Sequence, residues 1–464
     1  MMELDELQDI LEDIVPDDAE SVIYTDEFIE FVLGLMEEFI RDDPVGMMEE
    51  DFHETLIHET FEVVLSHFEG EIMFYQYAKC KDRIDEISLL LHESFVPPRS
   101  QESEVLTQLT RAGTRKLTDQ INVLRNKPQP EQRTAEWYVF RHNLITASNA
   151  YKLLVGGSEY NQIVFEKCKP VPVVTAASAS VPRGAVNVET TLHWGQKYEP
   201  LSVMIYEYMY NTRVEDFGCI QHETYSFLGA SPDGINVELN NERYGRMLEI
   251  KNIVNRDITG IPKLEYWVQM QLQMETCGLG ECDFLETRFA EYENEEAYDT
   301  DPAEVEYKGM IMYFSKAGAP IYKYAPLHLS KPDLLAWEEA QHAAMTCDEC
   351  IWVKNIFWKL DEYSCVLVCH NEMWFSAALP ILREGWTTIE YERENGYAHR
   401  APTRRAQKSK DAEKQEGAGN CLLVLNKDTG QVSVSSGEVR PAALLSNELR
   451  IRTESVDETR DRIT

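Results

Sequence analysis

The stretch GASPDGINVELNNERYGRMLEIK, residues 229–251, decides the fold of this chain. It places a Pro-Asp-Gly turn beside the apolar run SFLGA and a Glu-Ile-Lys sequence at the end of the run RMLEI. If these two runs pair as neighbouring strands, Asp233, Glu249 and Lys251 come within reach of one another. The plain alternative is a hairpin whose charged residues face solvent, and the flanking sequence must distinguish the two.

The bulk composition is that of a globular protein with room for two or three domains. The chain has 464 residues, of which 43% are hydrophobic. Its first residues lack a positively charged segment followed by an apolar one, and no run of 18 apolar residues occurs. Ten cysteines are scattered without a framework pattern. We therefore expect an intracellular protein with reduced cysteines and no membrane partner.

The formal net charge of −37 is the opposite of what a nucleic-acid partner requires, but it is unevenly distributed. Residues 1–100 hold 28 acidic and 5 basic side chains, a local balance of −23. A local groove can differ from the average potential of the whole protein. The acidity therefore bears on partners and solubility more than on catalysis.

Four segments are predicted along the chain. Residues 1–127 form an acidic helical domain, since EFIEFVLGLMEEFI and HETFEVVLSHFEGEIMFYQYA carry apolar residues at helical spacing. Residues 128–398 alternate helix and strand signals, which predicts an α/β domain with a mixed sheet flanked by helices. Residues 399–418 are a polar, basic, flexible linker, with a nuclear-import or nucleic-acid tether as the alternative. Residues 419–464 are a β-hairpin and tail.

Within the α/β domain, several elements are predicted individually. Helices are expected in AEWYVFRHNLITASNAYKLL, with a break near Ile145–Ser148 where Ser148 caps a new start, and in TLHWGQKYEPLSVMIYEYMYN, which contains Pro200. A third helix, KLEYWVQMQLQMETCG, ends at Gly278. Strands are expected in TRVEDFGCI and CDFLETRFA.

Asp233, Glu249 and Lys251 suit the hydrolysis of a phosphodiester. That reaction needs a hard cation on oxygen ligands, an activated water and a positive group near the phosphate. The two carboxylates and the carbonyl of Ile250 are oxygen ligands. Lys251 shares a strand face with Glu249, so its ammonium can orient or help deprotonate the water and offset charge. Together they predict the core of a metal-dependent hydrolase.

Flanking motifs add candidates to this core. Glu199 in WGQKYEP is a further metal ligand or, alternatively, an ordinary acid at a helix start. Gln269 in YWVQMQLQ is a site residue or a polar helix position, and Gln271 and Gln273 are assigned to the latter kind.

A separate motif, EWYVFRHNLITAS, contains Trp137, Arg141 and Ser148. A guanidinium and a hydroxyl near a helix start suit a terminal phosphate, because Arg binds it bidentately and helix N-termini attract anions. Arg141 as a surface salt-bridge partner is the alternative.

The pieces W-x3-R-x3-ITAS, WGxxYE, SPDG…LE-x-K and YWxQxQ occur in an order and spacing that resemble the lambda-type exonuclease family, the YqaJ-like viral recombinases. This family belongs to the PD-(D/E)xK nuclease superfamily, and the resemblance covers residues 135–290. The segment FWKLDEYSCVLVCHNEMWFSAALPILREGW, residues 357–386, also looks like the C-terminal part of such enzymes from large DNA viruses. The family resemblance implies a restriction-endonuclease-like core. The acidic front and the last 60 residues resemble nothing known to us.

The resemblance implies a role for each matching position. Asp233, Glu249 and the Ile250 carbonyl would bind two Mg²⁺ or Mn²⁺ ions, and Lys251 would be the catalytic lysine. Glu199 would join the metal shell and Gln269 would line the site. The residues Arg141, Ser148 and Trp137 would hold the 5′-phosphate of DNA, and Glu223 occupies a position where relatives carry another acid.

The implied activity is Mg²⁺-dependent degradation of duplex DNA from 5′ ends, leaving 3′ single strands for viral recombination, repair or genome processing. The implied partners are duplex DNA ends and a single-strand annealing or recombination protein, at viral replication sites in host cytoplasm or nucleus. Phage members form trimers, whereas the extensions here leave the oligomeric state open. Alternatives are a structure-specific endonuclease, an RNA-cleaving shutoff nuclease, or a non-catalytic DNA-end-binding scaffold.

Two further features have competing interpretations. The pairs Cys347/Cys350 and Cys365/Cys369, with His370, have the spacing of a zinc site, but SCVLVC also fits a buried strand, so we expect no structural zinc or iron–sulfur cluster. The acidic front is predicted to be a folded interaction module. Its sharper alternative is a mimic of DNA charge that competes for a basic cleft or recruits an annealing partner.

Overall fold

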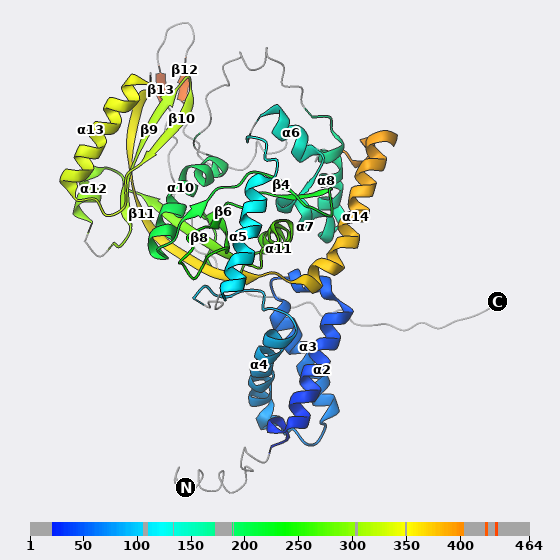
Figure 1. Cartoon of the computed structure of the whole chain (residues 1–464). Coiled ribbons are helices and arrows are strands. Elements are labelled where there is room, and N and C mark those ends of the chain that lie inside the picture. Colours follow the sequence, from blue (N-terminus) through cyan, green and yellow to red (C-terminus); the bar gives the residue numbers. More distant parts are fainter. Residues whose placement is uncertain are drawn as a thin grey trace, which may run out of the picture. The chain divides into compact units, whose positions relative to one another are not determined.

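The computed structural model describes residues 21–104, 110–132, 134–171, 188, 190–301, 305–348, 350–402, 423–425 and 432–434 (Figure 1). Two compact units, Met1–Ala401 and Pro402–Thr464, make up the chain. In the second unit, β12 (Leu423–Leu425) pairs antiparallel with β13 (Val432–Val434). The predicted turn between them, the tail beyond and residues 403–418 of the predicted linker lie outside the described residues.

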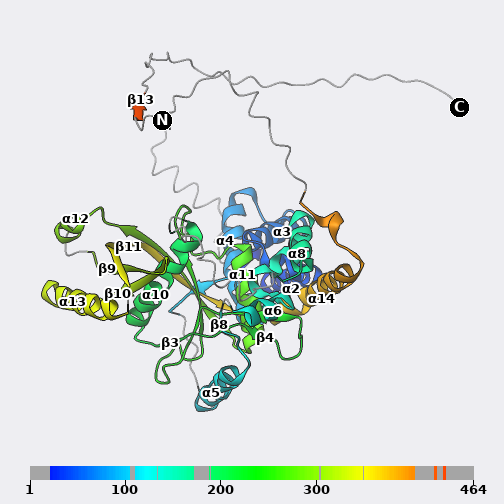
Figure 2. The same ribbon diagram turned by 90° about the horizontal axis from the view of Figure 1, so that it is seen from above.

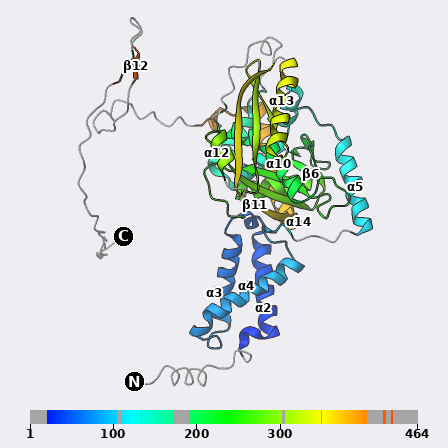
Figure 3. The ribbon, with the colours of Figure 1, turned by 90° about the vertical axis from the view of Figure 1, so that its left-hand side faces the viewer.

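Three helices, α2 (Asp26–Asp42), α3 (Phe52–His67) and α4 (Tyr77–Ser94), lie side by side near the N-terminus (Figure 3). The short 3-10 turns η2 (Val22–Tyr24), η3 (Pro44–Met48) and η4 (Phe74–Gln76) accompany them. The apolar stripe predicted for α2 is confirmed, because the side chains four apart on it are buried: Phe28, Val32, Met36 and Ile40. The helix expected through 58–78 is wrong in its middle. The chain leaves α3 at Phe68 and turns at Gly70, which adopts φ +85°, a conformation that favours glycine.

The main sheet has eight strands in the order β10-β9-β11-β8-β7-β6-β3, with β1 paired to β11. Only β7 and β8 are parallel, so the sheet is mixed. Its strands are β1 (Gln101–Glu102), β3 (Val214–Glu215), β6 (Gly234–Asn236), β7 (Met247–Asn252), β8 (Glu281–Glu291), β9 (Lys308–Lys316), β10 (Ala319–Tyr324) and β11 (Ile351–Cys369).

A second, small sheet has the order β2-β5-β4, from β2 (Ile145–Thr146), β4 (Ile220–Gln221) and β5 (Leu228–Ala230). It corrects the expected pairing, because SFLGA forms β5 here and the partner of RMLEI is instead the short strand β6. The strand expected in TRVEDFGCI is likewise divided between β3 and β4, which belong to different sheets. The turn SPDG therefore connects the two sheets.

Helices cover both faces of β7. Alternate residues point to opposite faces. Leu248 and Ile250 pack with Tyr206 of α10 (Thr191–Met209), whereas Met247 belongs to the large core that includes α11 (Leu264–Cys277). The other helices are α5 (Arg111–Asn126), α6 (Ala135–His142), α7 (Ala147–Val155), α8 (Gly157–Cys168), α12 (Glu295–Thr300), α13 (Lys331–Cys347), α14 (Glu372–Asn395) and η5 (Ala398–Arg400) (Figures 1 and 2). The predicted class, a mixed α/β sheet flanked by helices with an N-terminal helical region, is confirmed.

Local predictions in this region also hold. The helix 135–154 is interrupted by β2, α10 accommodates Pro200, and α11 ends at Gly278 in the left-handed conformation, φ +64°. One detail is wrong: Thr146 is the N-cap residue of α7, and Ser148 lies one residue inside the helix. Within the described residues, no helix is both long and apolar enough to cross a bilayer.

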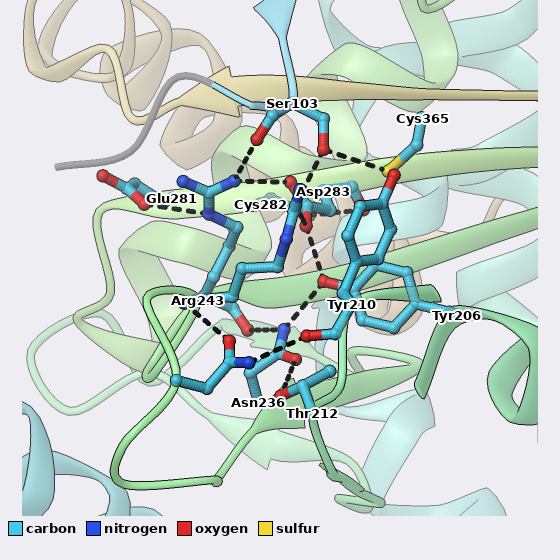
Figure 4. Close-up of polar contacts among 12 residues, drawn as sticks. Ser103, Tyr206, Tyr210, Thr212, Asn236, Arg243, Glu281, Cys282, Asp283 and Cys365 are labelled. Atoms are coloured by element: carbon cyan, nitrogen blue, oxygen red, sulfur yellow. Dashed lines mark hydrogen bonds and ion pairs between the residues drawn. The ribbon is translucent and has the colours of Figure 1, made fainter. Parts of the chain in front are cut away.

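A buried ion network braces β6, β7 and β8 (Figure 4). Asp283 on β8 has no exposed surface, and it pairs with Arg243 and with Arg246 (3.0 Å), both in the β6–β7 connection. The Tyr206 hydroxyl donates to the same carboxylate at 2.5 Å, and Ser103 accepts from Arg243 at 2.7 Å. Because burial of either charge alone is costly, this network holds the β6–β7 hairpin in register with β8.

Candidate active site

Asp233 and Glu249 face each other across two neighbouring strands. The strands β6 and β7 run antiparallel, with Gly234 opposite Leu248. Continuing this register by one residue places Asp233 opposite Glu249. Directly opposed residues of an antiparallel pair have Cβ atoms about 4.5–5.5 Å apart. The hairpin thus brings the two predicted carboxylates together.

The Glu249 carboxylate is fully buried and accepts three hydrogen bonds from side chains. Its Oε1 accepts from Lys251 Nζ and from Gln269 Nε2 (2.7 Å), and its Oε2 accepts from Gln273 Nε2 (2.7 Å). Both glutamines lie on α11 and are four residues apart, so they share one helix face. These donors compensate the burial of the carboxylate and fix its orientation.

Asp233 lies beside the same strand. Its Oδ2 accepts the backbone N–H of Ile250 at 2.8 Å. Burial raises the pKa of Asp233 well above its usual value, and the negative charge of Glu249 raises it further, while Lys251 acts in the opposite direction. An acid whose pKa is raised by desolvation and by a second carboxylate is a common feature of functional sites.

Lys251 is held as a cation between these groups and an aromatic ring. Its Nζ donates to Glu249 and, at 3.5 Å, to Gln269 Oε1, and it lies 4.7 Å from the centre of the Tyr266 ring. Burial alone would lower the pKa of Lys251, but the charges of Glu249 and Asp233 outweigh it and raise the pKa. Lys251 therefore suits neutralising the charge on a phosphate and orienting a water molecule. It is a poor base while its ion pair with Glu249 persists.

The oxygens gathered here fit a divalent cation. Asp233, Glu249 and the Ile250 carbonyl are hard oxygen ligands of the kind that Mg²⁺ and Mn²⁺ prefer. The negative charges of Glu249 and Glu199, which help to raise the pKa of Asp233, would attract a cation to this position. Beside them, Gln273 Oε1 is a buried acceptor without a hydrogen-bond partner among the described residues.

Glu199 lies farther out. It is exposed on α10, and its charge contributes to the raised pKa of Asp233. In the described ranges, no three His, Cys, Asp or Glu side chains are arranged as a group that could hold a metal ion. Glu223, the remaining acidic candidate, is exposed in the turn between β4 and β5.

The candidates for a terminal phosphate lie next to the SPDG turn. Arg141 is at the C-terminal end of α6, with Nη1 3.5 Å from the Ser231 hydroxyl of that turn and its guanidinium 4.7 Å from the centre of the Trp137 ring. Ser148 is exposed in the first turn of α7, and its Oγ is 3.5 Å from Thr146 Oγ1. The N–H groups at this helix start attract anions.

Two basic residues that the sequence did not indicate extend this region. Lys167 on α8 donates to the Arg141 carbonyl at 2.7 Å, and Arg393 on α14 donates to the carbonyls of Lys167 (3.0 Å) and His142 (2.7 Å). Burial, and then the charges of Arg141 and Arg393, lower the pKa of Lys167 to about 8. No local signal could reveal this cluster, because Lys167 and Arg393 are 226 residues apart.

Gln273 is a site residue that its motif does not reveal. The motif predicts a polar helix position, whereas the residue is fully buried and contacts Glu249. Its four-residue spacing from Gln269 was the available signal. Gln271, by contrast, is structural, because it donates to the Cys369 carbonyl at 2.9 Å and accepts from the Asn371 N–H at 2.7 Å.

The cysteines with zinc-like spacing are spread along one strand. Cys350 precedes β11 and Cys369 ends it, and β11 has 19 residues. At about 3.3 Å per residue, the two thiols are separated by roughly 60 Å of strand. One ion therefore cannot bridge Cys350 and the Cys365/Cys369 pair. The side chain of Cys347 lies outside the described residues.

The fold and the site together define a mixed α/β domain with a carboxylate pair and a lysine at a central hairpin and an arginine beside them. Residues 136–280 match the YqaJ-like viral recombinase domain. This confirms the predicted family for that segment, which holds every predicted site residue.

Two individual proteins similar to this chain have low sequence identity to it. An uncharacterised protein of Acanthamoeba polyphaga mimivirus is 26% identical over 322 residues, which cover 59% of this chain and 55% of that protein. The chain thus spans about half the length of this viral relative. The crystal structure of an alkaline exonuclease from Laribacter hongkongensis, solved also with dAMP, is 18% identical and covers 56% of this chain and 95% of its own. Its TM-score of 0.33 is too low to support an inference.

Proposed function

We propose that this protein is a divalent-cation-dependent exodeoxyribonuclease that degrades duplex DNA from 5′ ends and leaves 3′ single strands. The observation that carries the proposal is the grouping of the buried Glu249 with the half-buried Asp233 and Lys251 at one hairpin. The YqaJ-like domain over residues 136–280 supports the same function.

The proposed chemistry assigns a task to each side chain. Asp233, Glu249 and the Ile250 carbonyl would hold Mg²⁺ or Mn²⁺, which supplies a Lewis acid that lowers the pKa of a bound water. Lys251 offsets the charge that develops on the attacked phosphate. Gln269 and Gln273 keep the Glu249 carboxylate in one orientation, because both donate to it from the same helix face.

The proposed 5′ polarity rests on the arginine site. The Arg141 guanidinium is a fixed fork that can bind a terminal phosphate with two hydrogen bonds, and the start of α7 with Ser148 adds further donors. Because Arg141 contacts the SPDG turn, a terminal phosphate bound there would place the adjoining nucleotide near Asp233.

We further propose that the products serve viral recombination, repair or genome processing at replication sites in host cytoplasm or nucleus. A single-strand annealing or recombination protein is the expected recipient of the 3′ strand. The acidic N-terminal helices are a candidate surface for that partner.

The function is tested with duplex DNA labelled separately at its 5′ and 3′ ends, incubated with Mg²⁺ or Mn²⁺ and with chelator. Early release of the 5′ label, dependent on the cation, is the expected result. Nicked circular DNA and RNA of the same sequence are the controls, and preferential cleavage of either would indicate an endonuclease or an RNA-cleaving enzyme. Binding of DNA ends without any cleavage would contradict the proposal and favour a scaffold.

A further inference from the structure

A cavity of about 200 Å³ opens between the start of α10 and the strands β8 to β11. Figures 1 and 2 show α10 beside β9 and β10. The lining of the cavity includes Trp194, Lys197, Glu291, Tyr313, Tyr322 and Lys354. The last four lie beyond residue 280, where the family match ends. The cavity is therefore built jointly by the matched domain and by the strands that follow it.

Aromatic rings form much of the wall. The rings of Tyr313 and Tyr322 have centroids 5.2 Å apart and are tilted by 34°, and Trp194 packs on Tyr198 at 4.5 Å. A hydrogen bond of 2.6 Å between His193 Nε2 and the Tyr322 hydroxyl fixes the second tyrosine against α10. Aromatic faces of this kind stack with any nucleobase, because every base has a π-face.

The polar groups of the cavity complement this wall. Lys197 Nζ donates to Glu291 Oε1 at 2.5 Å and lies 4.5 Å from the centre of the Trp194 ring. Tyr198 donates to the same oxygen at 2.9 Å, which leaves Glu291 Oε2 as an acceptor. Trp194 Nε1 is a buried donor without a hydrogen-bond partner among the described residues. Lys354 is exposed at the rim, so a phosphate can approach it.

The cavity lies near the end of β7, the strand that carries Glu249 and Lys251. Asn252, the residue after Lys251, donates through Nδ2 to the Gly195 carbonyl at 3.2 Å, next to Trp194 in the sequence. Val254 lines the cavity as well. Three residues of chain span at most about 10 Å, so the backbones of Lys251 and Val254 are no farther apart than about that distance.

We propose that this cavity binds one unstacked nucleobase of the DNA strand that occupies the active site. Its size suits a single base better than a drug-sized ligand, since sites for the latter measure about 300–1,000 Å³. Trp194, Tyr313 and Tyr322 stack on the base, and Lys354 meets the adjoining phosphate. Unstacking costs least at a strand end, where the proposed exonuclease acts. The inference rests on that proposed function and adds a contact that holds the strand in place.

The test uses the unmodified full-length protein and a set of 5′-phosphorylated duplexes with one abasic residue at each of the first several positions. Affinities are measured by fluorescence anisotropy in chelator, so that no turnover is needed. We expect one position at which loss of the base weakens binding about tenfold, within the range measured for base–aromatic stacking. Equal affinities for all abasic positions would overturn the inference, whatever the variants do.

Two variants link the effect to the cavity. Trp194→Leu should flatten the dependence on position, whereas Trp352→Leu, an exposed tryptophan of β11 outside the cavity, should retain it. A position-dependent profile that survives in a folded Trp194→Leu protein would place the base elsewhere and refute the assignment. If the affinity does not depend on the abasic position while cleavage is intact, the base-binding role of the cavity is refuted and the nuclease proposal stands. If the affinity depends on the abasic position but Mg²⁺ supports no cleavage, the nuclease proposal is refuted and the base-binding role of the cavity stands.

Discussion

The side-chain amide of Gln273 donates to Oε2 of Glu249 over 2.7 Å. Two residues away, Gln271 on the same helix turns to the Cys369 carbonyl instead, at 2.9 Å. Because positions two apart lie on nearly opposite sides of a helix, α11 supports the carboxylate site with one side and the loop before α14 with the other. Identical residue types in the motif YWVQMQLQ therefore have different tasks.

Gln273→Met should slow cleavage by about 10–100-fold while the protein stays folded, because Glu249 loses a donor that orients it. Steady-state rates at saturating Mg²⁺ and a thermal melt measure the two effects. Gln271→Met is the matched control, and it should lower the melting temperature while leaving the rate within about twofold of the unmodified protein. A Gln273→Met enzyme with a normal rate would show that Glu249 needs no such support.

Asp233→Asn should abolish cleavage and also change the response to cations. Burial and Glu249 raise the pKa of Asp233, so its ionised form destabilises the cation-free protein as pH rises through that raised pKa. Near pH 8 the variant should melt at a higher temperature than the unmodified protein without cations. It should also lack the rise in melting temperature on adding Mg²⁺ or Mn²⁺. A persisting cation-induced rise would place the ion elsewhere.

Arg141→Ala should weaken the preference for 5′-phosphorylated over 5′-hydroxyl ends by about tenfold, since one bidentate charge-assisted contact is lost. The ratio of kcat/KM on the two substrates is the readout, and general effects on folding cancel in it. Arg111→Ala, an exposed arginine at the start of α5, serves as the control. An unchanged ratio in the Arg141 variant would assign the phosphate to other donors.

Asp283→Ala should cost about 3–5 kcal/mol in the free energy of unfolding, because Arg243 and Arg246 would be left buried without a counter-charge. Urea denaturation gives this value. Glu362→Ala breaks the more exposed pair with Arg288 and should cost under about 1 kcal/mol. Similar losses in both variants would mean that the network of Figure 4 does not brace the hairpin.

Lys167 should make the free energy of unfolding depend on alkaline pH. Its pKa falls from 10.5 to about 8 in the folded protein, so the unfolded chain binds more protons between those values and stability rises with pH there. The rise should amount to roughly 3 kcal/mol at most. Lys167→Met should remove it in urea denaturation from pH 7 to 10, whereas Lys169→Met, an exposed neighbour, should not. Parallel pH profiles for Lys167→Met and the unmodified protein would exclude the burial effect.

Much of the fold was predictable where the determinants are local. The stripe from Phe28 to Ile40 repeats every four residues, Gly278 ends α11, and the strand predicted in CDFLETRFA lies within β8. Each depends on backbone geometry within a few residues. The partner of β7 was mispredicted because SFLGA is more apolar than Gly234–Asn236, yet it pairs in the small sheet. Apolar character alone does not choose between strands.

The sequence by itself determined the chemistry of the candidate site, since Asp233, Glu249 and Lys251 lie at one short hairpin whose register follows from the period of a strand. Only the tertiary structure decided which distant groups surround it. In the folded chain Gln273 donates to Glu249, and Lys167 and Arg393 pack beside Arg141. Tyr313 and Tyr322 complete the lining of the aromatic cavity. Those contacts join segments far apart in the chain, and packing of the helices and strands sets them.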